Sequence, residues 1–129
     1  MSKVGRFEEL VAWQKARGLT RSVYEVTRQV SLAKDFGLAG QMQRAAVSIM
    51  SNVAEGFERG SAADFHRFLS MAKASCAELR SQLYVASDVG YLDRVGFQAL
   101  LQQSEEVSRI LGALRAAVGR RRDQQKGKP

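Results

Sequence analysis

The sequence predicts an all-α fold, specifically an antiparallel up-down-up-down four-helix bundle. In four separate stretches, apolar or small residues recur at alternating spacings of three and four, which places each set on one face of a helix. The single proline of the 129 residues is Pro129, so no proline interrupts these stretches. The stretches are long and the connections between them are short, which favours antiparallel neighbours and therefore a bundle.

The first predicted helix spans residues 8–30, with a core stripe that starts at Ala12 and ends at Val30. Glu8 and Glu9 fall in its first turn, where negative charge suits the helix dipole. The residues that follow, up to residue 37, are expected to form the first connection.

The second predicted helix spans residues 37–58, and the other helices are expected to pack around it. Its middle, from Ala45 to Ala54, contains no charge, no proline and no glycine. Small residues in this segment let neighbouring helices come close. A helix that is apolar or small over most of its circumference is usually buried on several sides. We therefore expect it to be the central element of the bundle.

Turn and capping signals delimit the last two helices, which are predicted at residues 62–88 and 94–120. Ser61 is a favourable N-cap, and Asp64 three residues later completes a pattern that resembles a capping box. Asp93 is the candidate N-cap of the last helix.

Composition divides the chain into three parts. Residues 1–6 are expected to be a mobile arm and residues 7–119 the four-helix bundle. Residues 120–129 are basic and lack apolar side chains, so they are expected to be a disordered tail. The N-terminus has no signal-peptide pattern, and no apolar run approaches the length of a membrane span. These features predict a cytoplasmic protein.

The net charge of +7 is concentrated towards the chain ends. Residues 38–93 carry five basic and six acidic side chains, whereas residues 94–129 carry eight basic and three acidic ones. This balance favours a polyanionic partner, and no base-reading motif is present, so we expect RNA or DNA to be bound without sequence preference. A tail that only improves solubility is the alternative. The candidate nucleic-acid-binding residues are Lys3, Arg6, Arg115, Arg120, Arg121, Arg122, Lys126 and Lys128. The arm and the tail are expected at the same end of the bundle, where they would form one basic rim.

The sequence offers no catalytic or metal-binding constellation. Its one histidine, His66, and its one cysteine, Cys76, are ten residues apart on one predicted helix. They would lie about 15 Å apart along the axis, too far for a nucleophile–base pair. We expect His66 to be a surface or packing residue and Cys76 to be a buried thiol. A di-metal bundle needs Glu-x-x-His pairs, which the sequence lacks. No catalytic residue, metal or cofactor is predicted, and the protein is expected not to be an enzyme.

Two polar stripes run beside the apolar stripes of the second and third predicted helices. We expect them to face each other and to form a hydrogen-bonded structural network, because buried polar groups must be satisfied to be tolerated. A ligand or catalytic pocket around Glu55 and Glu78 is the alternative interpretation. The residues of the two stripes are Ser48, Asn52, Glu55, Ser75, Glu78 and Gln82.

Several segments resemble one known family. They are FEELVAWQKA (residues 7–16), VYEVT (residues 23–27), FGLAGQMQRAAVSIMSNVAEGFERGS (residues 36–61) and FHRFLSMAKASCAELRSQLYVASDVGYL (residues 65–92). These segments are similar to the four-helix-bundle proteins also called the ribosomal-RNA intervening-sequence protein family. A related branch is the accessory variability determinant of diversity-generating retroelements.

The resemblance implies antiparallel four-helix bundles that assemble as homopentameric rings. It also implies, for the related branch, binding of a reverse transcriptase and of nucleic acid. It supplies no catalytic residues and no cofactor, and it assigns a structural role to the motif residues Ser48, Asn52, Glu55, Ser75 and Glu78.

Taken together, the sequence predicts a non-enzymatic oligomeric bundle that binds nucleic acid and serves as an accessory to a reverse transcriptase. The alternative is a structural or adaptor oligomer whose partner is another protein. Apolar residues off the main stripes are the candidates for subunit contacts: Phe7, Trp13, Val47, Met50, Met71, Leu101 and Ile110.

Overall fold

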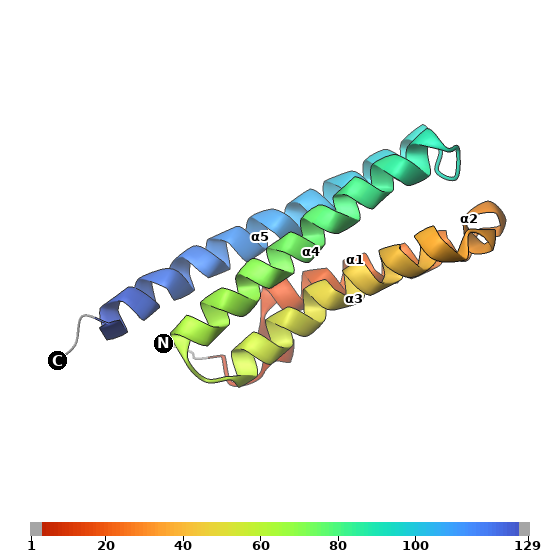
Figure 1. The fold of residues 1–129 in the computed structure, drawn as a ribbon. Coiled ribbons are helices and arrows are strands. Elements are labelled where there is room, and N and C mark those ends of the chain that lie inside the picture. Colours follow the sequence, from red (N-terminus) through yellow and green to blue (C-terminus); the bar gives the residue numbers. More distant parts are fainter. Residues whose placement is uncertain (1–3, 127–129) are drawn as a thin grey trace.

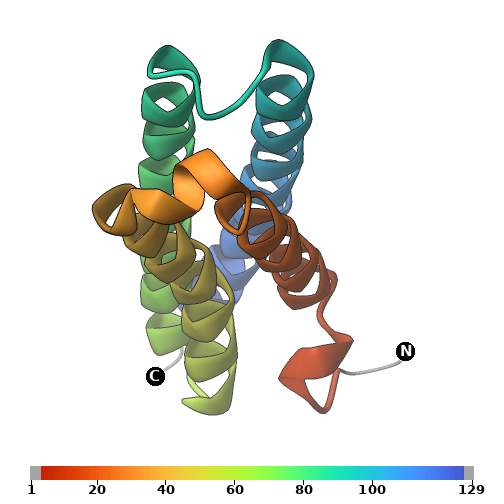
Figure 2. The same ribbon diagram turned by 90° about the vertical axis from the view of Figure 1, so that its right-hand side faces the viewer.

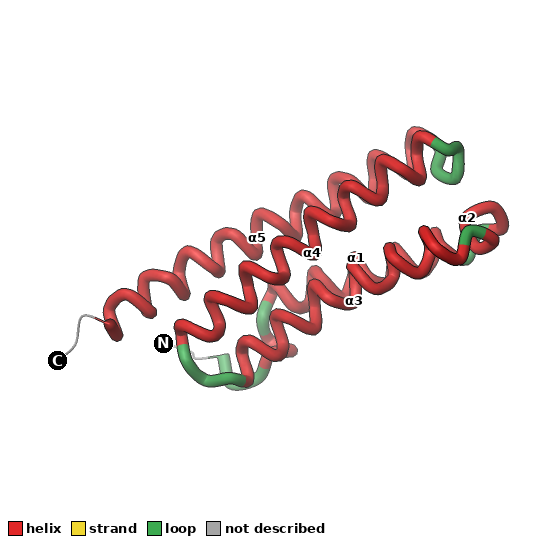
Figure 3. Tube along the Cα trace, in the orientation of Figure 1, coloured by secondary structure: helices red, strands yellow, loops and turns green. Residues whose placement is uncertain are grey.

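The computed structural model describes residues 4–126 of the chain. This part is helical outside its short turns, as Figure 3 shows, and it contains no strand. The all-α class is therefore confirmed, and the protein is a helical bundle. Its elements are the 3-10 turn η1 (Phe7–Glu9) and the helices α1 (Val11–Thr27), α2 (Val30–Lys34), α3 (Phe36–Glu58), α4 (Ala62–Asp88) and α5 (Arg94–Lys126).

The four long helices surround one core. Helix α4 packs along both α3 and α5, and α1 packs against α3 and α5 on the other side. In Figure 2 the four helices stand at the corners of a rough square, with α4 next to α3 and α5 next to α1. The turn between α3 and α4 lies at one end of the molecule, while α2 and the turn between α4 and α5 lie at the other (Figure 1).

The first predicted helix is shorter in the structure than its apolar stripe suggested. Residues 7–9 form η1, and Leu10 is extended, so α1 begins at Val11. At the other end α1 stops at Thr27. Val30, the predicted last residue of the stripe, is exposed, whereas Leu32 of the short helix α2 is fully buried. The chain therefore enters the core again inside the segment that was predicted to be only a connection.

The last helix is longer than predicted. Helix α5 continues through Lys126, so residues 120–126 are helical and not the disordered tail that composition suggested. Val118 and Gly119 are buried, and Arg122 contacts His66 of α4, which holds this part of the helix against its neighbour. Arginine, glutamine and lysine also have good helix propensity.

At the N-terminus, Glu9 accepts hydrogen bonds from the backbone N–H groups of residues 5 and 6.

Helix α3 contributes much of the core but is not its centre, because it packs against α1 and α4 while α4 packs along both α3 and α5. Met42, Ile49 and Val53 of this helix are fully buried, together with Leu79 and Leu83 of α4. Helices α3 and α4 approach each other closely at Gly56. A Cβ atom at this position would lie 2.5 Å from the Cβ of Phe68, a separation that real Cβ atoms do not tolerate. The missing side chain of Gly56 is therefore a requirement of the packing.

The predicted subunit-contact residues fall into two groups. Phe7, Trp13, Met50 and Ile110 are partly buried against the chain's own core. Leu101 is half-buried, whereas Val47 and Met71 are exposed. Of these residues only Val47 and Met71 are exposed, and each is less than half exposed.

If the close approach at Gly56 is required by the packing, alanine substitutions at Gly56 and at Gly18 should change the free energy of unfolding in opposite directions. Gly56→Ala should lower the free energy of unfolding by about 1–3 kcal/mol, because overpacking outweighs the gain in helix propensity. Gly18→Ala, also inside a helix, places its Cβ 3.9 Å from the nearest atom of Gln103. That variant should gain about 0.5–1 kcal/mol from propensity alone. Urea unfolding of both variants measures the two effects, and a shift in the same direction for both would contradict this account of the α3–α4 contact.

Candidate nucleic-acid interface

The outer groove between α4 and α5 is lined by two facing rows of side chains. On α4, His66, Lys73 and Arg80 recur every seven residues, and on α5 Arg115 and Arg122 keep the same spacing after Ser108. Seven residues are about two helical turns, or about 10.5 Å, so the members of each row share one helix face.

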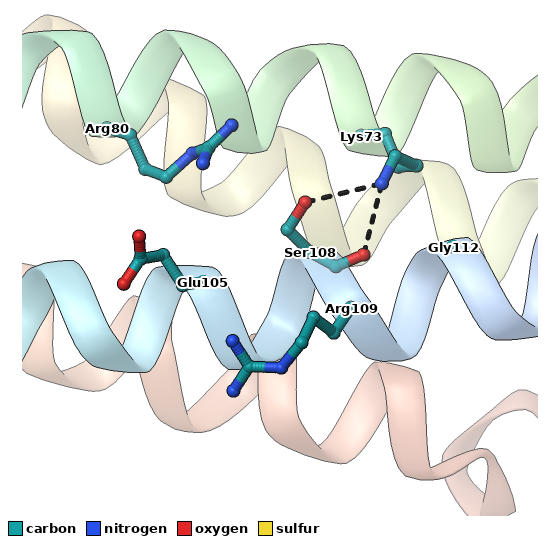
Figure 4. Close-up of a pocket in the computed structure, with 6 residues that line it drawn as sticks. All are labelled: Lys73, Arg80, Glu105, Ser108, Arg109 and Gly112. Carbon is teal, nitrogen blue, oxygen red and sulfur yellow. Dashed lines mark hydrogen bonds between the residues drawn. The ribbon is translucent and has the colours of Figure 1, made fainter.

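Three contacts across the groove show that the rows meet. The Lys73 ammonium donates to the carbonyl oxygen of Ser108 at 3.2 Å and to its Oγ at 3.3 Å (Figure 4). Arg115 donates to the Oγ of Ser70 at 3.3 Å. Arg122 lies 3.1 Å from Nδ1 of His66. The cations are thus held in place by neutral groups of the opposite helix.

The middle of the groove opens into a pocket of about 250 Å³, shown in Figure 4. Arg80 extends along α4 towards Lys73, and Glu105 lies on α5 across from Arg80. The Nε atom of Arg80 is buried and has no hydrogen-bond partner within the described part of the chain. Gly112 makes room for Lys73, because a Cβ there would come within 3.3 Å of the ammonium. The residues that line the pocket are Lys73, Arg80, Glu105, Ser108, Arg109 and Gly112.

Eight cations lie in the α4–α5 groove or on the C-terminal turns of α5, and most of them have no carboxylate partner among the described residues. Across residues 4–126, only Arg122 among them forms an ion pair, with Asp123 at 3.1 Å. We call the whole set the basic surface. Its members are Lys73, Arg80, Arg109, Arg115, Arg120, Arg121, Arg122 and Lys126.

The structure divides the predicted nucleic-acid-binding residues. Arg115 and Arg122 lie in the α4–α5 groove, and Arg120, Arg121 and Lys126 lie on the C-terminal turns of the same helix. Arg6 lies outside this surface: it belongs to the N-terminal turn, which packs against α1 and α3, and it pairs with Glu8 at 3.2 Å. No hydrogen bond or ion pair among the described residues joins Arg6 to the C-terminal cations. Lys3 and Lys128 lie outside the described residues.

Lys73, Arg80 and Arg109 were missed by the sequence reasoning. The segment that contains the first two has balanced charge, which concealed them. The seven-residue spacing of His66, Lys73 and Arg80 could have identified them, because it places the three side chains on one helix face. The net charge of the segment does not show this.

The predicted polar network forms only in part. The Oγ atoms of Ser48 and Ser75 are 2.9 Å apart and join α3 to α4. Asn52 extends this link by donating to the carbonyl oxygen and the Oγ of Ser48, at 2.9 and 3.0 Å.

The remaining members of the predicted network lie apart from it. Glu55 is exposed and pairs with Arg59, and Glu78 is also exposed. Gln82 is buried, with an unpartnered Oε1 among the described residues.

Cys76 is the buried thiol that its position predicted. Its Sγ donates to the carbonyl oxygen of Ser104 at 3.2 Å, and burial raises the pKa of the thiol. Among the described residues no group of three or more histidine, cysteine, aspartate or glutamate side chains could hold a metal ion. In the same part of the chain, no helix combines the length and the apolar character that crossing a membrane requires.

The fold and the groove define an all-α helical-bundle protein with a basic surface on α4 and α5. Residues 8–113 match the 23S rRNA-intervening sequence protein family, and the chain belongs to this family. A protein of unknown function from the S23 ribosomal protein family of Bacteroides thetaiotaomicron has a similar crystal structure, with a TM-score of 0.76 and 24% sequence identity. The match covers 82% of this chain and 96% of that one, and it supports the fold. No curated protein is significantly similar in sequence.

The surroundings of His66 in the α4–α5 groove lower the pKa of its imidazole. Arginine can only donate hydrogen bonds, so Nδ1 of His66 must accept from Arg122 and the imidazole is neutral, with its proton on Nε2. Burial lowers the pKa of His66 below its ordinary value of 6.5, and the charges of Arg122 and Arg115 lower it further. Asp123 acts in the opposite direction.

This shift predicts a pH dependence of stability. Between the lowered pKa of folded His66 and its value near 6.5 in the unfolded chain, the unfolded state binds more protons, so stability falls as the pH falls through this window. The free energy of unfolding of the wild type, relative to His66→Gln, should be constant above about pH 7.5 and decrease below about pH 6.5. Glutamine can still accept from Arg122. Urea titrations of both proteins from about pH 5 to about pH 8 measure this relative stability. A wild type that becomes more stable relative to the variant towards low pH, or that keeps the same relative stability throughout, would refute the assignment.

Proposed function

We propose that this protein is a non-enzymatic helical bundle that binds RNA or DNA through the basic surface of α4 and α5. One observation carries the proposal. Seven of the eight cations of this surface have no carboxylate within ion-pair distance among the described residues. Clustered like charges repel one another, and a polyanion relieves this repulsion and releases its own counterions when it binds.

The contacts would be made to the sugar–phosphate backbone and not to the bases. The cations line an interhelical groove and an exposed helix end, and no sequence motif of the chain matches one that enters a nucleic-acid groove to read bases. Binding of this kind is independent of sequence and strongly dependent on salt.

The oligomeric organisation belongs to the same proposal. We propose that the four long helices form an antiparallel up-down-up-down bundle and that the subunits assemble as a homopentamer, as the family resemblance implies. Exposed Val47 and Met71, on neighbouring helices α3 and α4, support a contact there. Five copies would carry a net charge of 5 × 7 = 35. A reverse transcriptase as protein partner is proposed from the same resemblance, and a cytoplasmic location is proposed from the sequence features described above.

A second candidate function is that of an adaptor for another protein. It is favoured by apolar side chains exposed at the end of the molecule opposite the C-terminal turns of α5. These side chains belong to α2, the start of α3, the α4–α5 turn and the start of α5: Val30, Phe36, Val89 and Val95.

The nucleic-acid proposal predicts that affinity depends on where cations are removed and not only on the net charge of the protein. The triple variant Arg120→Ala, Arg121→Ala, Lys126→Ala removes three exposed cations from the basic surface. The matched variant Arg21→Ala, Arg28→Ala, Arg94→Ala removes three exposed cations elsewhere. For duplex DNA, the slope of log affinity against log salt should become less steep by about 0.9 for each phosphate that the first variant no longer neutralises. The slope should change little in the second variant.

Fluorescence anisotropy of labelled single-stranded and duplex oligonucleotides, titrated from about 50 to 200 mM salt, measures these slopes. Circular dichroism checks that helix content is unchanged. If the wild type does not bind at the lowest salt, or if both triple variants show the same reduction in slope, the proposal fails and the adaptor function is favoured.

A further inference from the structure

The pocket in the middle of the α4–α5 groove has a chemistry of its own. It lies between the helices, away from the exposed C-terminal turns of α5, and three of its six lining residues are cations: Lys73, Arg80 and Arg109. Glu105 is its single acidic residue, and no ion pair among the described residues joins it to any of the three cations.

Two of these cations bring positive charge to the pocket without a carboxylate partner among the described residues. Lys73 is bonded to neutral oxygens of Ser108, so its positive charge is not neutralised. The Nε–H of Arg80 is buried and unpartnered within residues 4–126. A buried donor without an acceptor costs free energy, and a charged one costs more. The Nε itself has no exposed surface, so an oxyanion in the pocket would act by offsetting the positive charges of Lys73 and Arg80.

We propose that this pocket, formed by Lys73, Arg80, Ser108 and Arg109, is a binding site for a phosphate group. The inference rests on the proposed function, because Lys73, Arg80 and Arg109 belong to the basic surface, but it is tested separately from the C-terminal cations. A guanidinium and an ammonium that converge on one space can bind several phosphate oxygens through charge-assisted hydrogen bonds. The Ser108 hydroxyl can add a further donor.

The lining residues also indicate which part of a ligand the pocket recognises. None of the six is aromatic, so the pocket provides no surface on which a base could stack. A volume of about 250 Å³ accommodates a phosphate or a short polyphosphate. Recognition therefore depends on phosphate charge and not on the base, whether the phosphate belongs to a free nucleotide or to a nucleic-acid chain.

A substitution of Glu105 should change the affinity for phosphate in the opposite direction to substitutions of the cations. Its carboxylate lies across the groove from Arg80 and repels an anion in the pocket (Figure 4). Glu105→Gln should therefore tighten phosphate binding, which loss of folding cannot do. Glu106→Gln is the matched control, because Glu106 pairs with Lys15 of α1 and does not line the pocket.

Isothermal titration calorimetry with inorganic tripolyphosphate, ATP and a 5′-phosphorylated oligonucleotide tests the site in the full-length protein. Arg80→Gln and Lys73→Gln should each weaken binding by about tenfold or more, the usual contribution of a hydrogen bond to a charged group. Arg94→Gln, with the same change in charge, should have little effect. Glu105→Gln should tighten binding by about threefold, and Glu106→Gln should not.

The probes distinguish the source of the phosphate. Similar affinities for tripolyphosphate and ATP, both reduced by Arg80→Gln, support a pocket for free polyphosphate. An effect of Arg80→Gln on the oligonucleotide alone supports a pocket for a nucleic-acid phosphate. The proposal is overturned if Arg80→Gln and Glu105→Gln bind every probe as the wild type does. It is also overturned if Arg94→Gln and Glu106→Gln reproduce their effects, since net charge would then be the cause.

Discussion

The close approach of α3 and α4 at Gly56 fixes how these two helices pack against each other, and α1 and α5 pack against this pair. Because Gly56 has no side chain, the Cβ of Phe68 occupies the space that a Cβ would need. The hydrogen bond between Ser48 and Ser75 joins the same two helices further along. With α4 fixed in this way on one side, α5 packs along its other side, and the outer groove between α4 and α5 is formed there.

Helix geometry places several cations along this groove. A side chain that recurs every seven residues returns to the same face, so His66, Lys73 and Arg80 line one edge of the groove. Hydroxyl and carbonyl groups of Ser108 on α5 and Ser70 on α4 hold cations of the facing helix without neutralising them. Lys73 and Arg80 on α4 and Arg115 and Arg122 on α5 therefore form a line of positive charge with few carboxylate partners among the described residues. This property connects the fold to a polyanionic ligand.

Much of the fold followed from the sequence because it depends on local periodicity. The α3 and α4 boundaries were predicted closely, since Ser61 and the glycines around it mark the turn between them. The errors came from contacts that periodicity does not encode. Leu32 is buried by tertiary packing after a turn, and residues 120–126 remain helical because Arg122 contacts α4.

The candidate site was only half predictable for the same reason. Charge totals along the chain identified Arg115 and the arginines at residues 120–122, which lie in a basic segment. They did not identify Lys73 or Arg80, whose segment is electrically balanced. The pairing of α4 with α5 brings these residues together, and that pairing is a property of the folded chain.

Lysine footprinting tests the central claim, that α4 and α5 carry the anion-binding surface, most directly. Lys73 and Lys126 belong to this surface, whereas Lys15 and Lys34 lie on α1 and α2 and serve as internal controls. Acetylation of each lysine is followed by mass spectrometry with and without a saturating oligonucleotide. The account predicts slower modification of Lys73 and Lys126 and unchanged modification of Lys15 and Lys34. Protection of Lys15 and Lys34 while Lys73 and Lys126 react as before would contradict it.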